Sequence, residues 1–350
     1  MPTTESSVAD PIHRPFDIGG ARAVTHARTM HALVAPAYGT PDVLRYEEIP
    51  VPEVRDDEVL VRVRAASVCK GDTILLSGKP YLARFAFGLT RPKHRIAGQN
   101  VAGTVAALGK NVTGLKLGDE VYGQTFGAFA EYAAVPSDAI APKPATLSFE
   151  EAAAMPVSAA TALEMIRAAD LRAGQSVIIV GASGGVGMFA VQIAKARGVK
   201  VTAVCSTRHV ARVREAGADE VVDYTNEDFA LRGERHDAMI DFVGGRALRD
   251  CRKALTPKGR YVYCGASRGD WIAPIVAMLE VVIFGLFVSQ TMKPAPVVFA
   301  KTHHLLALNA LALEGSLHPV IDRRYALRDA ADALRHVGEG HAQGTTVLTV

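Results

Sequence analysis

The sequence predicts an α/β protein with a β-barrel-like domain followed by a domain built on a doubly wound parallel sheet. Three observations lead to this fold class. The chain has 350 residues, a length that suits two domains. Before about residue 150 the sequence predicts short strands separated by turns. After it, predicted helices alternate with short apolar strands. A glycine-rich turn joins the first of those strands to a helix: Gly181-Ala182-Ser183-Gly184-Gly185-Val186-Gly187.

The overall composition is that of a folded globular protein. Hydrophobic residues make up 49% of the chain and charged residues 21%, which excludes disorder of the whole chain. The formal net charge is only +3, so we expect no nucleic-acid partner. The cysteines lie far apart in the sequence, which argues against a disulfide framework: Cys69, Cys205, Cys251 and Cys264.

Two segments differ from the rest of the chain. Residues 1–29 are polar, contain proline and glycine, and show no apolar period, so we expect a disordered extension that lacks the apolar core of a secretory signal. Met30 could be the true start. The most apolar stretch, Trp271–Val288, is interrupted by Pro274 and Glu280 and has about the minimum length of a membrane span. A buried helix or a hydrophobic interface is favoured over a span.

The first domain begins at Met30. Val59, Val61 and Val63 alternate with Leu60, Arg62 and Arg64. This pattern is typical of a half-buried strand. Turn signals such as Ser77-Gly78 follow at short intervals. Short strands at this spacing indicate a β-barrel-like domain.

The second domain alternates strands and helices from about residue 151. Glu151–Ala169 is rich in alanine and helix-prone, and two later helices end at glycines. Those helices are Phe189–Arg197 and Val210–Ala216. The predicted strands are Ser176–Val180, Lys200–Ser206, Glu220–Tyr224, Ala238–Val243 and Arg260–Cys264. Further on, Val320–Ala326 and Thr346–Val350 could return to the first domain. We therefore assign residues 30–151 and 290–350 to the barrel domain and 152–289 to the parallel-sheet domain.

The glycine turn predicts a dinucleotide site. Glycines at 181, 184 and 187 allow a tight turn, a close approach of backbone to a pyrophosphate, and close packing of helix on strand. The helix N-terminus offers free N–H groups and a partial positive charge to that phosphate. Strand, turn, helix and second strand all stand where the motif requires them. The residues expected to bind are Gly181, Ser183, Gly184, Gly185, Val186 and Gly187.

The end of the second strand indicates which dinucleotide binds. NAD sites usually place Asp or Glu there to hold the ribose 2′-hydroxyl. This strand instead ends in Ser206, Thr207 and Arg208. Hydroxyls and a guanidinium suit a 2′-phosphate, so NADP(H) is the expected cofactor. The alternative is a solvated turn with an incidental arginine.

From these motifs the chain, from Met30 to Val350, resembles the medium-chain dehydrogenase/reductase superfamily, and within it the zinc-free quinone oxidoreductase-like branch. Four further motifs resemble those of this branch: Gly98-Gln99-Asn100-Val101-Ala102-Gly103, Gly118-Asp119-Glu120-Val121-Tyr122-Gly123, Gly217-Ala218-Asp219 and Asp223-Tyr224. The resemblance implies a GroES-like catalytic domain split around a Rossmann domain, with the active site between them.

The resemblance also bears on metal binding. Zinc-dependent members use a barrel cysteine, a Gly-His-Glu motif and a second cysteine. Here Cys69 matches the first, but the motif reads Gly98-Gln99-Asn100 and the second position falls near Ser158. One thiolate without these partners cannot hold Zn²⁺ tetrahedrally, so we expect no metal site.

The absence of zinc restricts the substrates that we expect. Hydride addition to a simple ketone leaves a localised alkoxide that a metal would stabilise. Addition to a quinone or an enone leaves a delocalised anion that hydrogen-bond donors can stabilise. We therefore expect an NADPH-dependent reductase of quinones or α,β-unsaturated carbonyls. The alternatives are a zinc-free NADP-dependent alcohol or aldehyde oxidoreductase, and a regulatory protein that binds NADPH without turnover.

The resemblance suggests further site residues. Lys70 follows the cysteine position, where relatives place a basic residue near the cofactor phosphates, and Asp72 matches the aspartate of an Asn-Pro-x-Asp turn. Thr161 matches a threonine beside the nicotinamide and Tyr224 a residue beside the adenine ribose. Tyr81 is a candidate proton donor, although packing is the commoner role of a loop aromatic.

Two further glycines are expected at the cofactor site. Gly244 and Gly265 follow predicted strands, at the edge of the sheet where ligands bind in such folds. We expect a small-molecule quinone or enone substrate, a homodimer without a membrane span, and a cytoplasmic location.

Overall fold

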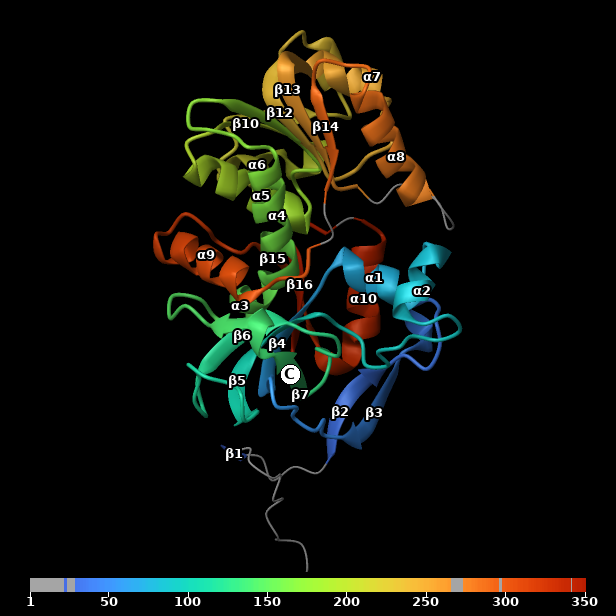
Figure 1. The fold of residues 1–350 in the computed structure, drawn as a ribbon, viewed down its shortest axis with the longest axis vertical. Coiled ribbons are helices and arrows are strands. Elements are labelled where there is room, and N and C mark those ends of the chain that lie inside the picture. Colours follow the sequence, from blue (N-terminus) through green and yellow to red (C-terminus); the bar gives the residue numbers. More distant parts are fainter. Residues whose placement is uncertain (1–21, 24–28, 266–272, 296–297, 341) are drawn as a thin grey trace, which may run out of the picture.

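The computed structural model describes residues 22–23, 29–265, 273–295, 298–340 and 342–350. A barrel-like half and a parallel-sheet half lie at opposite ends of the long axis, with helices and the C-terminal strands between them (Figure 1). The predicted fold class is thereby confirmed.

The barrel-like half is a largely antiparallel sheet. Its main path runs β15-β16-β4-β5-β6-β8, with β7 paired to β4 and β1 to β5, while β2 and β3 pair separately. The strands of this half before the parallel sheet are β1 (Arg22–Ala23), β2 (Thr29–Val34), β3 (Arg45–Pro50), β4 (Glu58–Val68), β5 (Asn100–Leu108), β6 (Glu120–Gln124), β7 (Tyr132–Pro136) and β8 (Ile140–Pro142).

The end of the chain returns to this sheet. β15 (Ile321–Ala326) and β16 (Thr345–Thr349) pair in parallel, and β16 pairs antiparallel with β4. The barrel-like half is thus assembled from two separated parts of the sequence, and the segments expected to return, Val320–Ala326 and Thr346–Val350, are the ones that do so.

The other half is a parallel sheet in the order β11-β10-β9-β12-β13-β14. Its strands are β9 (Ser176–Val180), β10 (Lys200–Cys205), β11 (Glu220–Asp223), β12 (His236–Asp241), β13 (Leu255–Tyr263) and β14 (Thr291–Pro294). The edge strand β14 extends the sheet past residue 289, the boundary expected from the sequence. The chain runs outward from β9 to β11 and then crosses to β12 on the other side of β9, which makes the β9–β12 edge the topological switch point.

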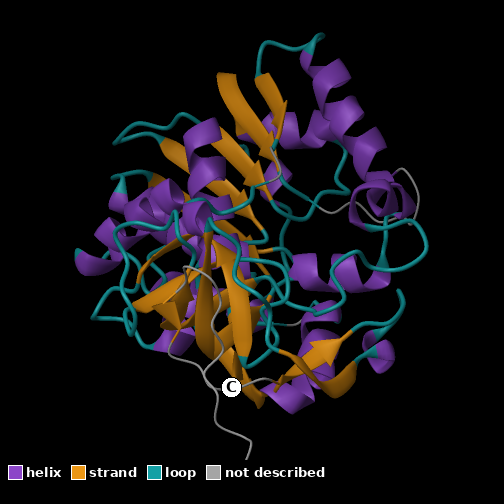
Figure 2. Ribbon diagram, turned by 60° about the horizontal axis from the view of Figure 1, so that its bottom comes forward, coloured by secondary structure: helices purple, strands orange, loops and turns teal. Residues whose placement is uncertain are grey.

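Helices cover both faces of the parallel sheet (Figure 2). Val177 and Ile179 of β9 share a core with α4 and α5, and Ile178 shares another with α7 and α8. The helices are α1 (Lys70–Ser77), α2 (Arg84–Phe87), α3 (Phe149–Ala154), α4 (Pro156–Ala168), α5 (Gly185–Ala196), α6 (Val210–Glu215), α7 (Leu248–Cys251), α8 (Ala273–Gly285), α9 (Thr302–Leu313) and α10 (Ala330–Gly338).

The helix α4 links the two halves. The sequence predicts one helix over Glu151–Ala169, but the structure divides it into α3 and α4 at Met155. Pro156 stands at the first position of α4, where its missing N–H is no loss. The core around α4 also takes in Tyr122 of the barrel half and Leu305 of α9, so both halves share one apolar interior.

The apolar segment around α8 is not a buried helix. Val281 is buried against the sheet, but several large apolar side chains of this segment are exposed. They are Val276, Leu279, Val282, Ile283, Leu286 and Phe287. The expectation of a hydrophobic interface fits this better than that of a buried helix. Among the described residues, no helix has both the length and the apolar character needed to cross a membrane.

Candidate active site

The glycine turn lies at the switch point of the sheet. β9 ends at Val180, and Gly181 turns the chain with φ +81°, a conformation that favours glycine. A Cβ on Gly187 would lie 2.2 Å from the carbonyl oxygen of Gly181, so only glycine lets α5 start this close to β9. The N-cap is Gly184, which has no side chain to cap the helix. The first-turn N–H groups of α5 are thus arranged to receive an anion.

Two hydroxyl side chains stand over this helix start. A Cβ built on Gly185 would lie 3.6 Å from Ser158 Oγ and 3.8 Å from Thr345 Oγ1. Ser158 belongs to α4 and Thr345 to β16, and both residues are buried. The phosphate cradle is therefore lined by three elements, two of them outside the glycine motif. Sequence reasoning did not identify either hydroxyl, because neither belongs to a local motif.

The turns that follow β12 and β13 pack against the glycine turn. A Cβ on Gly181 would lie 2.8 Å from Val243 Cγ2, and one on Gly265 would lie 2.9 Å from the Val243 carbonyl. The carboxylate of Asp241 accepts the N–H groups of Val243 and Gly244 at 2.9 and 2.8 Å. The structure thus places Gly181, Gly244 and Gly265 together, and Asp241 holds the turn between them.

The end of β10 carries the residues expected to select NADP(H). Ser206 is buried, whereas Thr207 and Arg208 are exposed. Tyr224, 62% exposed, donates its backbone N–H to the Cys205 carbonyl at 3.0 Å, so it lies beside this strand end.

A carboxylate that sequence reasoning missed lies beside these residues. Asp223 pairs in register with Cys205, and its carboxylate accepts the Thr207 hydroxyl at 2.5 Å. It also accepts hydrogen bonds from Thr225 and Asn226. The Thr207 hydrogen bond is the main reason that its pKa lies below the usual value. The strand end therefore does have an acidic neighbour, supplied by β11, and only the parallel register reveals it.

A second region of the site surrounds Asp72, at the start of α1. Asp72 is 3% exposed, and its Oδ2 accepts the Cys69 N–H at 2.8 Å. Gln99 Nε2 donates to Oδ1 at 3.2 Å and lies 3.8 Å from the Cys69 sulfur. Burial raises the pKa of Asp72 to about 6. Burial, reinforced by the neighbouring Asp72, raises the pKa of the Cys69 thiol well above its usual value.

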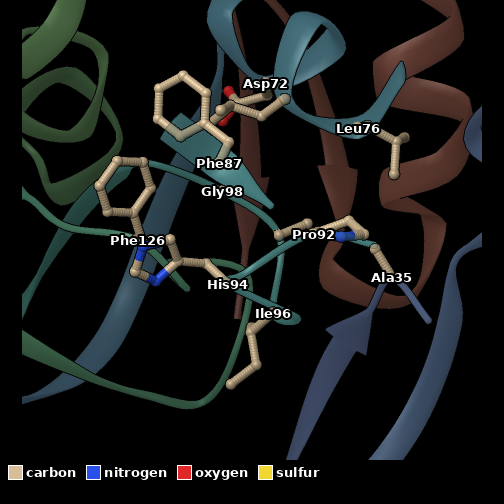
Figure 3. Close-up of a pocket in the computed structure, with 11 residues that line it drawn as sticks. Ala35, Asp72, Leu76, Phe87, Pro92, His94, Ile96, Gly98 and Phe126 are labelled. Atoms are coloured by element: carbon tan, nitrogen blue, oxygen red, sulfur yellow. The ribbon is translucent and has the colours of Figure 1, made fainter. Parts of the chain in front are cut away.

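Asp72 lines an apolar pocket (Figure 3). The empty space among these residues is about 450 Å³, a volume that includes open solvent. His94 stacks on Phe126 with ring centroids 4.3 Å apart, and burial lowers the pKa of His94. The remaining lining is mostly apolar: Ala35, Leu75, Leu76, Phe87, Pro92, Ile96, Ala97 and Gly98. A pocket of apolar walls with one acid and one imidazole is of the kind that binds small organic ligands.

Two adjacent residues connect this pocket to the phosphate cradle. Gln99 contacts Asp72, and Asn100 Oδ1 accepts the Val157 N–H at 2.9 Å, one residue before Ser158. The hydroxyl of Thr161 donates to the Val157 carbonyl at 2.7 Å within α4. The N-terminus of α4 thus ties the two regions into one site.

The other two candidate residues do not line this pocket. The Lys70 ammonium contacts the Gly338 carbonyl at 3.4 Å, at the end of α10. Tyr81 opens the short 3-10 helix η2 (Tyr81–Ala83), and the Arg84 guanidinium lies 4.7 Å from its ring centroid. Neither is among the residues that line the pocket of Asp72.

The positions that hold zinc in related enzymes carry other side chains. Cys69 and Gln99 lie together, as described, and Ser158 stands over Gly185. Within the described ranges, no three His, Cys, Asp or Glu side chains form a group that could hold a metal ion.

Two family models match this chain. The model of the alcohol dehydrogenase GroES-like domain covers residues 55–145, and that of zinc-binding dehydrogenases covers residues 216–348. A quinone oxidoreductase from Mus musculus is 32% identical, over 92% of this chain and 97% of that protein. The chain belongs to the medium-chain dehydrogenase/reductase superfamily. Within it, the similarity is to the quinone oxidoreductase-like branch.

Two more comparisons agree with this assignment. An NADPH-dependent alkenal/one oxidoreductase of Arabidopsis thaliana, described as chloroplastic, is 32% identical over 92% of this chain and 80% of that protein. The structure of a quinone oxidoreductase from Coxiella burnetii superposes with a TM-score of 0.81 at 29% identity, covering 92% of this chain and 99% of that one. The medium-chain dehydrogenase/reductase fold predicted from the motifs is confirmed.

Proposed function

We propose that this member of the superfamily is an NADPH-dependent reductase of quinones or α,β-unsaturated carbonyls. The observation that carries the proposal is the joining of two regions through Gln99 and Asn100. One is a phosphate cradle at Gly185, and the other an apolar pocket that contains a buried acid, Asp72. The names of the Mus musculus and Arabidopsis thaliana relatives support the same reaction class.

The residues of the cradle fit a dinucleotide phosphate. The first-turn N–H groups of α5 and the hydroxyls of Ser158 and Thr345 would hold the pyrophosphate. Ser206 and Arg208 would hold the 2′-phosphate. Bound NADPH supplies a hydride to the substrate. Thr161 and the turns at Gly244 and Gly265 would lie beside the nicotinamide.

On the substrate side, Asp72 is the candidate proton donor. A pKa of about 6 leaves part of the Asp72 population protonated near neutral pH, so it can give a proton to the delocalised anion left by hydride addition. Amides and a hydroxyl replace the ligands that zinc prefers, since Gln99, Asn100 and Ser158 occupy those positions. We therefore expect turnover that does not depend on zinc.

The test is oxidation of NADPH with a panel of quinones, enones and simple alcohols, repeated after treatment with a chelator. With NADPH deuterated at C4, label should reach the β-carbon of an enone and leave the carbonyl intact. Label on the carbonyl carbon, or loss of turnover with the chelator, would contradict the proposal.

We also propose a homodimer formed through α8 and β14. β14 is the edge of the parallel sheet, and α8 beside it exposes a row of apolar side chains. A patch of this kind favours burial against another protein surface. Leu279→Lys together with Phe287→Lys should convert a dimer to a monomer in light scattering, whereas a wild-type monomer at all concentrations would contradict the proposal.

The cytoplasmic location expected from the sequence stays a prediction. The Arabidopsis thaliana relative is described as chloroplastic. Fractionation of cells that express the full chain would test it.

A further inference from the structure

The segment 79–95 forms an exposed surface, here called the 79–95 surface, that combines apolar and basic side chains. Phe85 is 77% exposed, Leu89 63% and Leu82 37%, although all three are large apolar residues. Arg91, Lys93 and Arg95 are exposed in the same segment. Apolar side chains that stay in water between cations are the pattern of a docking surface.

The charge of this surface has one sign. No Asp or Glu occurs in the sequence between Asp72 and Asp119. With the described residues, Arg91, Lys93 and Arg95 form no ion pair within 4.0 Å. Arg91, Lys93 and Arg95 therefore present positive charge at this surface, and the matching occupant carries negative charge.

The backbone holds the apolar and basic residues next to one another. Gly88 ends α2 with φ +115°, and a Cβ there would lie 2.1 Å from the Arg91 carbonyl. The Lys93 N–H donates to the Phe87 carbonyl at 2.7 Å. The chain thus folds back after α2, which brings Arg91 next to Gly88 and Lys93 next to Phe87, at the end of the helix that carries Phe85.

The same segment forms the mouth of the Asp72 pocket. Phe87, Pro92 and His94 line that pocket (Figure 3), and in the sequence they alternate with exposed residues of the 79–95 surface. In Figure 1, α2 lies at the outer side of the barrel half, where a flat partner can approach it.

We propose that the 79–95 surface docks the protein on a membrane that contains anionic lipids. Basic residues are drawn to acidic headgroups, and exposed Phe and Leu side chains insert at the boundary of headgroups and acyl chains. If the proposed function is right, the pocket then opens onto the phase in which apolar quinones and alkenals dissolve. A lipid surface accounts for both the apolar and the basic side chains, whereas an acidic protein would account for the charge alone.

Flotation of the full chain with lipid vesicles tests this without any substrate. The protein should float with mixed phosphatidylcholine–phosphatidylglycerol vesicles, less with pure phosphatidylcholine, and less at high salt. Arg91→Glu with Lys93→Glu, and separately Phe85→Ser with Leu89→Ser, should each weaken binding by roughly tenfold or more. NADPH affinity should not change, because none of these residues lies in the cofactor site.

Matched controls lie elsewhere on the surface. Lys258→Glu changes an exposed cation of β13, and Leu313→Ser an exposed apolar residue of α9, and neither should affect flotation. Failure of the wild type to float, or equal loss in the controls, would overturn the proposal. So would loss only with Leu279→Lys in α8, or a change of oligomeric state by the 79–95 variants without any vesicle binding. Because NADPH oxidation is not measured, a negative result here leaves the proposed reductase activity standing.

Discussion

At the scale of single residues, Asp72 is the most constrained group of the site. It is buried, and it accepts hydrogen bonds from the Cys69 backbone and the Gln99 side chain. In the sequence it stands out only through the resemblance to an Asn-Pro-x-Asp turn. The raised pKa comes from burial, which the sequence alone does not give.

Asp72→Asn should change the pH dependence of catalysis. If Asp72 donates the proton, kcat of the wild type falls as the pH rises through about 6, because the protonated form is lost. The Asn variant should be slower and should not show this fall. A wild-type pH profile that the variant reproduces in shape would contradict the role.

The same substitution should change the pH dependence of stability. The pKa of Asp72 is raised in the folded state, from 3.8 to about 6, so the folded protein binds more protons than the unfolded chain between these pH values. The wild type therefore loses stability relative to Asp72→Asn as the pH rises from 4 to 6, by up to about 3 kcal/mol. Urea unfolding of both proteins at a series of pH values measures this. A constant difference would show that Asp72 titrates normally in the fold.

Arg208 and Asp223 should have opposite effects on cofactor choice. Arg208→Ala should weaken NADPH binding by roughly ten- to hundredfold and leave NADH binding little changed, since a charge-assisted hydrogen bond contributes about 1.5–3 kcal/mol. Asp223→Asn removes a negative charge beside Thr207 and should favour NADPH further. Fluorescence titration with both cofactors distinguishes these effects. Equal affinity of the wild type for both cofactors would contradict the assignment.

At the scale of elements, the ends of the parallel strands determine the positions of the turns expected to bind the cofactor. The sequence predicts a strand over Ala238–Val243, but β12 stops at Asp241. The Phe242 N–H still donates to the Val180 carbonyl, but the Asp241 carboxylate accepts the N–H groups of Val243 and Gly244, and Val243 lies against Gly181. The apolar run extends past this turn, so hydrophobicity alone does not locate the strand end.

The start of α5 offers a matched pair of glycine substitutions. Gly187→Ala should abolish NADPH binding and lower the melting temperature, because its Cβ would lie 2.2 Å from the Gly181 carbonyl. Gly184→Ala should keep the fold, because its Cβ would meet only that carbonyl, at 3.6 Å, and its φ is −74°. Thermal melts and NADPH titration of both variants check this. Similar losses in the two variants would mean that close packing is not what requires glycine at 187.

At the scale of the whole molecule, the sheet of the barrel-like half is complete only when the end of the chain returns to it. β16 pairs with β4, and Thr345 at its start reaches the cradle at Gly185. Tyr122 of β6 donates its hydroxyl to Asn309 of α9 at 2.7 Å, which joins the barrel to a helix that follows the parallel sheet. These contacts connect residues more than a hundred positions apart.

Removal of residues 1–29 should leave this assembly intact. In the described part of that segment, β1 pairs with Ala107 and Leu108 of β5, and Thr29 begins β2 and pairs with Pro50 of β3. A chain that starts at Met30 should keep its melting temperature within a few degrees and its NADPH affinity. A large loss of either would show that the segment docks on the barrel.

The local sequence predicts much of the secondary structure of this protein, because the patterns that favour strands, turns and helices extend over only a few residues. The strand Ser176–Val180 and the glycine turn after it follow from apolar runs and glycine spacing, and the structure places them as predicted. Ser206 and Arg208 follow likewise from their place at a strand end, whereas Asp72 is a candidate only through the family resemblance.

Tertiary structure alone brought in the remaining groups. Ser158 and Thr345 meet at Gly185, Asp223 meets Thr207, and Gln99 meets Asp72 across 27 positions. Such meetings depend on strand register and on the packing of α4 between the halves, which are set by the burial of apolar surface over the whole chain. Burial also sets the pKa of Asp72, since desolvation depends on every element that covers the carboxyl group.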